Sequence, residues 1–186
     1  MRVGRGAGVV LALALGACRS RDAGTPDAGV LPPPSALTCA GLVTPEIRDA
    51  LPGFTVQEER TCPTCGPLCT FRSAEQKDVT VSIAYDCHKF PDGQDVRGLL
   101  APTLRAGGVE VPALGKAAAR REPVPGMMQV VTWDDDTPCG IVVTWLGKDR
   151  DRALELARTT LFGITQERLL QASTPPPAPA PDAGPL

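Results

Sequence analysis

The cysteines constrain this chain more than any other feature. It has 186 residues and seven cysteines. Cys18 lies apart from the others, close to the N-terminus, and six cysteines lie between Cys39 and Cys139. In an exported chain, an even set of six predicts up to three disulfides formed in an oxidising compartment. The count alone leaves their connectivity open.

The N-terminus has the pattern of an export signal. Arg2 and Arg5 precede an apolar stretch over Val9–Leu15, which is shorter than the roughly 20 residues that span a bilayer. The tetrad Leu15–Cys18 then resembles the bacterial lipobox, which the lipoprotein signal peptidase cuts before the cysteine. We therefore expect a signal peptide over residues 1–17 and a lipid-anchored Cys18 at the start of the mature chain.

The anchor predicts where the protein lies. Each buried methylene of an acyl chain contributes about 0.8 kcal/mol, so several chains on Cys18 would hold the protein firmly at a membrane of the cell envelope. In lipoproteins, Asp directly after the modified cysteine favours the inner membrane. This chain has Arg19 there, so the resemblance implies the outer membrane in a bacterium with two membranes. An ordinary export signal with a chance cysteine is the alternative.

Proline-rich segments flank the middle of the chain. Residues 18–37 contain a Pro-Asp-Ala-Gly unit and a run of three prolines, and the same unit recurs within residues 174–186. Such composition cannot bury enough apolar surface to offset the entropy of ordering, so we expect both ends to be disordered. Residues 38–173 remain as a single globular domain.

The net charge argues against a nucleic-acid partner. It is -2 for the whole chain, and removal of the signal peptide would make it more negative, because Arg2 and Arg5 are lost and no acid is. Proteins that bind nucleic acid show basic patches or stripes. The expected partners are the membrane, through Cys18, and an unknown envelope protein or small ligand.

Hydrophobic periodicity and capping residues predict the elements of the domain. Thr44 is expected to cap one helix and Asp149 another, and Pro102 is expected to kink or split a third. Residues 134–138 are turn material between two strands that both contain Val-Val-Thr-Trp, which predicts a hairpin. The expected helices cover residues 44–51, 95–106, 149–163 and 165–172, and the expected strands cover 54–58, 68–73, 79–85, 109–111, 116–122, 127–133 and 141–146.

This order of elements predicts the fold class. Helices at the start, middle and end, with runs of strands between them, are typical of an α+β domain. We expect an antiparallel sheet covered by helices and stabilised by disulfides.

Several short motifs resemble a family of small bacterial lipoproteins known as domain of unknown function 3558. They are Leu42–Glu46 after Cys39, Cys69–Phe71, the strand Val79–Tyr85, Val111–Ala118 and the terminal helix. In that family an early cysteine pairs with the one in the Cys-Thr-aromatic strand, which implies a disulfide between Cys39 and Cys69. The chain departs from the family in its Cys62–Cys65 insertion. The family has no established activity, so the resemblance implies fold and location only.

Cys62 and Cys65 have the spacing of a thiol–disulfide exchange motif. Pro63, Gly66 and Pro67 surround the pair and no long helix follows, so a structural disulfide is the favoured interpretation. We also favour a disulfide between Cys87 and Cys139, which lie at the ends of two predicted strands.

Two groups of residues have the chemistry of metal ligands. Cys62, Cys65 and Cys69 with Cys87 and His88 could bind zinc, but a second close pair at matching spacing is missing and export favours disulfides. Asp134, Asp135 and Asp136 could bind calcium, but consecutive acids lack the alternating spacing of calcium loops. We predict no metal and no cofactor.

No catalytic residue is predicted. His88 is the only histidine, and no serine lies in a nucleophile-elbow motif. We expect an uncharacterised, lipid-anchored envelope protein that acts as a non-catalytic binding or structural module. The alternatives are a thiol–disulfide redox protein that uses Cys62 and Cys65, and a zinc-binding module.

Overall fold

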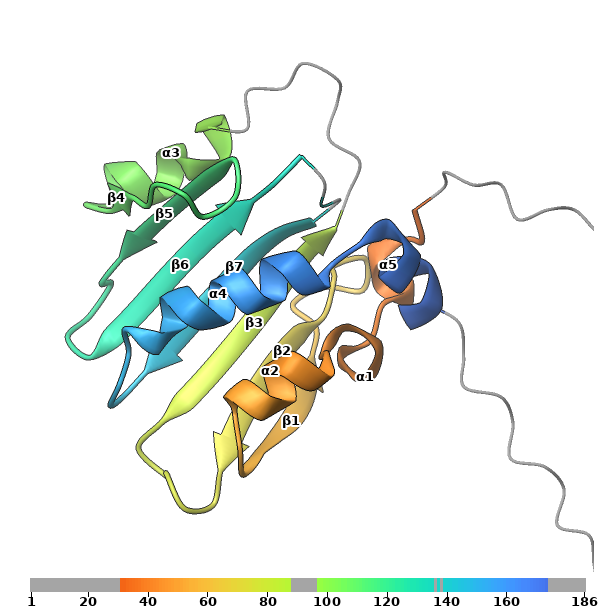
Figure 1. Ribbon diagram of the computed structural model, residues 1–186, viewed down its shortest axis with the longest axis horizontal. Coiled ribbons are helices and arrows are strands. Elements are labelled where there is room, and N and C mark those ends of the chain that lie inside the picture. Colours follow the sequence, from red (N-terminus) through yellow and green to blue (C-terminus); the bar gives the residue numbers. More distant parts are fainter. Residues whose placement is uncertain (1–30, 88–96, 136, 138, 174–186) are drawn as a thin grey trace, which may run out of the picture. The chain divides into compact units, whose positions relative to one another are not determined.

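The computed structural model describes residues 31–87, 97–135, 137 and 139–173 (Figure 1). The helices are α1 (Cys39–Leu42), α2 (Pro45–Ala50), α3 (Arg97–Arg105), α4 (Arg152–Gly163) and α5 (Gln166–Ala172), preceded by the short 3-10 helix η1 (Pro34–Ala36). The strands are β1 (Phe54–Glu59), β2 (Leu68–Ser73), β3 (Thr80–Cys87), β4 (Val109–Glu110), β5 (Ala117–Arg121), β6 (Met127–Trp133) and β7 (Cys139–Leu146).

The strands form one antiparallel sheet in the order β1-β2-β3-β7-β6-β5-β4. Consecutive strands pair on each side, as β1-β2-β3 and as β4-β5-β6-β7, and the two meanders meet where β3 pairs with β7. The β6–β7 hairpin and the α+β class predicted from the sequence are both confirmed.

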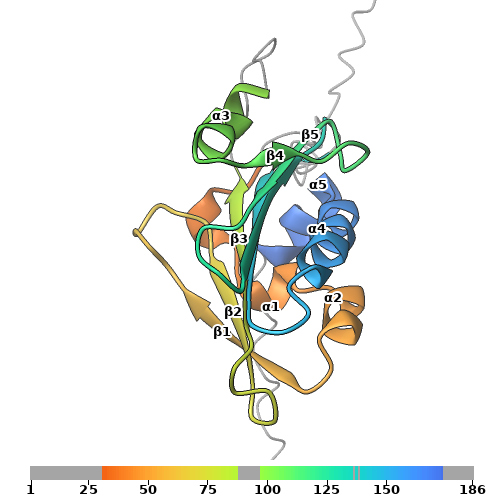
Figure 2. The ribbon, with the colours of Figure 1, turned by 90° about the vertical axis from the view of Figure 1, so that its left-hand side faces the viewer.

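Helices α1, α2, α4 and α5 cover one face of the sheet, which we call the covered face (Figure 2). The inward side chains alternate along each strand, as in Val81, Ile83 and Tyr85 of β3 and Ile141 and Val143 of β7. They pack with apolar residues of the helices in one continuous core. This core holds most of the buried apolar residues of the described part of the chain.

Helix α3 lies on the opposite face, which we call the open face, beside β5 (Figure 2). Leu100 of α3 packs there with Ala117, Ala119 and Trp133 in a second, smaller cluster. Among the described elements, α3 is the α-helix on this side, so the strands away from β5 keep half-exposed side chains.

Three disulfides link the described residues. Cys39–Cys69 ties α1 to β2, and Cys87–Cys139 joins directly paired residues of β3 and β7. Cys62–Cys65 closes a turn between β1 and β2. The fold is thus disulfide-stabilised, as expected, and the pairing implied by the family resemblance is present.

Local capping was predicted correctly for one helix and wrongly for another. The Thr44 hydroxyl accepts a hydrogen bond from the Ile47 backbone N–H at 3.3 Å, as expected of an N-cap. Asp149, the other expected cap, instead has φ 57° in the turn before α4, and Asp151 takes the N-cap position without a side-chain hydrogen bond. Pro102 does not split α3, which continues through it to Arg105.

The first packed residues lie earlier than the expected domain start at residue 38. Pro34–Ala36 form η1, and Leu37 is fully buried in the main core. Leu31 packs against the same core. The segment 31–37, which composition assigns to the tether, therefore belongs to the domain, because one leucine side chain finds an apolar site that composition alone does not reveal.

Candidate functional site

The open face of the sheet carries two contrasting rows of side chains. Register places Leu68, Ala84, Val142 and Val131 side by side across β2, β3, β7 and β6. Two residues further along each strand, the row is Thr70, Ser82, Thr144 and Gln129. One row is apolar and the next is polar, although both lie on the same face.

A groove of about 470 Å³ lies at the β2 end of the apolar row. Its floor is formed by Leu68, Ala84 and Val142, all half-buried. Its wall includes Cys65 and Pro67 of the loop before β2, together with Pro34 of η1. A mostly apolar lining and a volume of a few hundred Å³ are typical of small-molecule sites. We call this the open-face groove.

The loop that forms the wall is held at both ends. The Cys65 N–H donates to the Cys62 carbonyl at 3.2 Å, which closes a turn that the disulfide also bridges. Beyond it, the Tyr85 N–H donates to the Pro67 carbonyl at 3.3 Å. A Cβ atom at Gly66 would lie 2.0 Å from the Tyr85 carbonyl oxygen, so only glycine allows this close approach to β3.

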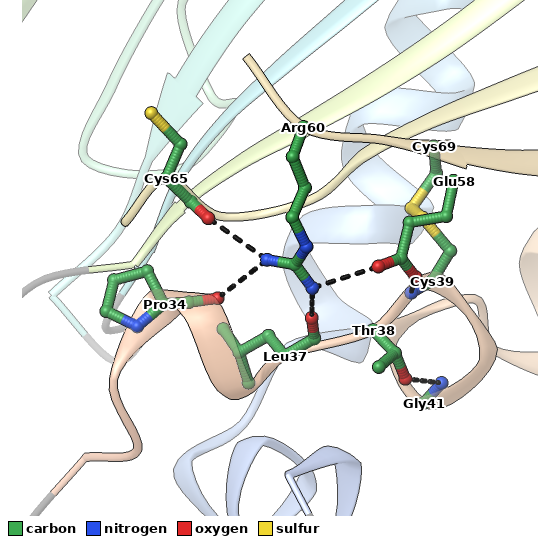
Figure 3. A network of polar contacts seen from close by, with 9 residues as sticks. All are labelled: Pro34, Leu37, Thr38, Cys39, Gly41, Glu58, Arg60, Cys65 and Cys69. Atoms are coloured by element: carbon green, nitrogen blue, oxygen red, sulfur yellow. Dashed lines mark hydrogen bonds and ion pairs between the residues drawn. A yellow bond between two sulfur atoms is a disulfide. The ribbon is translucent and has the colours of Figure 1, made fainter. Parts of the chain in front are cut away.

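Arg60 connects this loop to the start of the domain (Figure 3). Its guanidinium donates to the carbonyls of Cys65 at 3.1 Å and Pro34 at 3.5 Å, and also to that of Leu37. It forms an ion pair with Glu58 at 2.9 Å, and the other oxygen of this carboxylate accepts from the Cys39 N–H at 2.7 Å. We call this network the Arg60 clamp.

A second hollow, of about 590 Å³, lies on the helical side between α2, α4 and α5. Glu46, Glu167 and Arg168 line it, together with hydroxyl groups and the largely exposed Phe162. The pKa of Glu46 is lowered, first by the Thr44 hydroxyl and its own backbone N–H, and further by the charge of Arg168. The hollow is larger than the open-face groove, but it carries charges of both signs and its lining is less apolar.

The residues considered for metal binding are not assembled as a site. Cys62, Cys65 and Cys69 are all in disulfides, and His88 lies outside the described residues. Asp135 pairs with Lys116 at 2.5 Å, and Asp136 also lies outside the described residues. Within the described part of the chain, no group of three or more metal-ligating side chains comes together.

The Cys62–Cys65 pair lacks the helix that a thiol–disulfide active site uses. Both residues are half-exposed, but the next regular element along the chain is strand β2 instead of a helix whose N-terminus would lower a thiol pKa. Cys18, the expected lipidation site, lies outside the described residues.

Sequence reasoning did not identify the floor of the groove or Arg60. Ala84 and Val142 lie on strands whose other face forms the core, so their own alternation marks them as outward-facing. Only the strand pairing shows that they lie beside Leu68. Arg60 lies close in sequence to two of its partners, Glu58 and Cys65, but its other partners, Pro34 and Leu37, are more than 20 residues away.

Comparison with known proteins found no matching family model, no matching curated protein and no matching solved structure. The family resemblance therefore stays a prediction. None of the described helices is long and apolar enough to cross a membrane.

Proposed function

We propose that this protein is a lipid-anchored module of the cell envelope that binds an apolar ligand group in the open-face groove and performs no chemistry on it. The observation that carries the proposal is the groove itself. Its half-buried floor of Leu68, Ala84 and Val142 faces a hollow of about 470 Å³ beside the polar row of the same sheet face. Burial of such apolar surface by a ligand is favourable at about 25 cal/mol per Å².

The groove is also preformed, before any ligand binds. Its floor consists of paired strands, and its wall is held by a disulfide, by the close approach of Gly66 to β3 and by the Arg60 clamp. A preformed site spends less of its binding energy on ordering loops and side chains. This rigidity supports binding as the role of the groove.

Anchoring at Cys18 is the second part of the proposal. It is supported by the lipobox-like tetrad Leu15–Cys18 and by the even set of six cysteines that remains when Cys18 is set aside. An anchored module would present its groove at the membrane surface, and Arg19 after the cysteine favours the outer membrane where there are two.

The binding proposal can be tested with the apolar fluorescent probe N-phenyl-1-naphthylamine. We expect the wild-type chain to bind the probe and Ala84→Glu to weaken binding by about tenfold or more, because a carboxylate on the floor must be desolvated. The matched control is Ser82→Glu, on the same strand and face but in the polar row, and it should bind as the wild type does. Absence of probe binding by the folded wild type, or equal losses in both variants, would contradict the proposal.

The anchor is tested separately by cell fractionation. Wild-type protein should migrate at its mature size in the membrane fraction, and Cys18→Ala should accumulate unprocessed. If Cys18→Ala still reaches mature size and stays with the membrane, the lipobox interpretation is wrong.

A further inference from the structure

The three disulfides differ in their access to solvent. Cys39 and Cys69 are 2% and 0% exposed, and Cys87 and Cys139 are 3% and 0% exposed. Cys62 and Cys65, in contrast, are both half-exposed. Reduction proceeds by attack of a thiolate on a disulfide sulfur, so its rate depends on access. An external reductant therefore reaches Cys62–Cys65 before the other two.

This disulfide also closes the shortest loop of the three. It joins residues three apart, whereas the separations of the other two are 30 and 52 residues. Because the stabilisation grows with the length of the closed loop, opening Cys62–Cys65 leaves the main constraints on the fold in place. The local effect of opening it is thus separable from unfolding.

The local effect falls on the Arg60 clamp. The turn from Cys62 to Cys65 presents the Cys65 carbonyl to a guanidinium that also holds the carbonyls of Pro34 and Leu37 (Figure 3). Gly66 and Pro67 fix the far end of the loop to β3, independently of the disulfide. The disulfide, the Cys65–Cys62 backbone hydrogen bond and Arg60 together hold the near end.

The same residues form the wall of the open-face groove. Cys65 and Pro34 both line it, and each is held by the same guanidinium of Arg60. A change in the turn therefore changes the wall on which a ligand would rest, whereas the floor on β2, β3 and β7 stays in the sheet.

We propose that the Cys62–Cys65 disulfide is a redox-controlled latch that, when closed, holds the wall of the open-face groove in its binding shape. A dithiol reductant opens it: one thiolate attacks a sulfur of the pair, and the second thiol then closes the reductant into its own disulfide. Two electrons and two protons pass to the protein, which leaves thiols on Cys62 and Cys65. The effect on ligand affinity rests on the function proposed above; the effect on the clamp does not.

The test uses the folded chain, treated with increasing dithiothreitol, alkylated and analysed by mass spectrometry. We expect alkylation at Cys62 and Cys65 first. At that stage, hydrogen exchange of the Cys39 amide should be faster by about fivefold, the loss of roughly one hydrogen bond's stabilisation, whereas α4 stays unchanged. Simultaneous reduction of all three disulfides, or unchanged exchange around Leu37–Cys39, would overturn the latch.

Two variants separate the sulfur chemistry from the clamp. Cys62→Ala/Cys65→Ala should show the fast exchange without reductant and should respond to it no further. Arg60→Gln should show the same fast exchange while its Cys62–Cys65 disulfide remains intact. If the cysteine variant exchanges like the oxidised wild type, the disulfide does not hold the clamp.

Probe binding distinguishes failure of the latch from failure of the proposed function. We expect Cys62→Ala/Cys65→Ala to bind N-phenyl-1-naphthylamine about fivefold more weakly than wild type, because the wall must be ordered on binding. If the variant and the wild type bind the probe with equal affinity, the disulfide does not control the groove, but the proposed binding function is unaffected. No binding by the oxidised wild type would overturn the proposed function, and hydrogen exchange would still decide whether the disulfide holds the clamp.

Discussion

Tyr85 is the only tyrosine in the chain, and its side chain lies in the core on the covered face of the sheet. Its hydroxyl has no hydrogen-bond partner among the described residues. Burial raises its pKa well above the ordinary value, and the positive charge of Arg168 offsets only part of that rise. Tyr85 therefore stays a neutral phenol in the folded protein.

The single tyrosine makes this state directly measurable. Because the folded-state pKa is raised, ionisation of Tyr85 leaves stability unaffected below about pH 10, the ordinary tyrosine pKa, and lowers it as the pH rises beyond that value. We expect tyrosinate absorbance to appear only together with loss of the folded circular dichroism signal. Ionisation near pH 10 with the fold intact would contradict the burial of the hydroxyl.

Tyr85→Phe provides the matched comparison. At neutral pH we expect it to raise the free energy of unfolding by about 1 kcal/mol, because it removes a buried hydroxyl whose desolvation no described partner offsets. In alkali it should lose less stability than the wild type. Urea denaturation at neutral and alkaline pH measures both effects.

At the scale of elements, the sheet depends on the seam between its two meanders. Strands β3 and β7 are distant in sequence and pair over eight residues of each strand. Cys87–Cys139 closes one end of this seam, and both sulfurs are buried there. The strand pairing and the disulfide fix the same long-range contact, so each reduces the entropy cost of forming the other.

We therefore expect the disulfides to contribute unequally to stability. From the entropy of loop closure, the expected contribution to the free energy of unfolding is about 4 kcal/mol for Cys87–Cys139 and at most about 2 kcal/mol for Cys62–Cys65. The double variants Cys87→Ala/Cys139→Ala and Cys62→Ala/Cys65→Ala, compared by urea denaturation, measure the order. A larger loss in the second variant would show that the turn stabilises more of the fold than its position implies.

At the scale of the whole molecule, the domain begins before its first α-helix. Leu37 is fully buried, Leu31 packs on the core, and the Arg60 clamp holds two carbonyls of the segment 31–37. If Cys18 is the anchor, the segment that links it to the domain is shorter than the composition predicts. Twelve residues, 19–30, then span at most about 40 Å at roughly 3.1 Å each, compared with about 60 Å for the 19 residues first assigned to the tether.

Truncation tests this boundary. A chain that starts at Thr38 should lose about 2–3 kcal/mol of unfolding free energy relative to one that starts at Leu31, mainly through the burial of Leu37. Removal of residues 174–186, whose composition predicts disorder, is the control and should leave stability unchanged. If the two N-terminal truncations are equally stable, the segment 31–37 contributes nothing to the domain.

Much of the fold follows from local signals in the sequence. Thr44 and Thr165 cap helices because their hydroxyls accept backbone N–H groups within one turn. The strand β3 follows from the alternation of Val81, Ile83 and Tyr85. Asp149 was assigned wrongly because a neighbour two residues on, Asp151, offers the same side chain, and only the turn geometry selects between them.

The repeated Val-Val-Thr-Trp motif shows that local signals do not determine which face of the sheet a side chain occupies. Trp145 lies in the main core on the covered face, where Arg152 stacks over its ring at 5.1 Å, whereas Trp133 lies in the small cluster on the open face. The two copies have the same letters and both form strands. The hairpin register places them on opposite faces, because side chains alternate and the strands run antiparallel.

Most of the elements, the hairpin and the α+β class therefore follow from the sequence alone, since periodicity, caps and turns act within a few residues; η1 and α1 are helices that it did not predict. It also predicted the export signal and Cys18 anchor, which stay predictions. The seam of β3 with β7, the burial of Leu37 and the open-face groove, in contrast, depend on tertiary contacts. The floor and wall of that groove come from segments distant in the chain, and their meeting depends on strand order and on one arginine that reaches several backbone carbonyls at once.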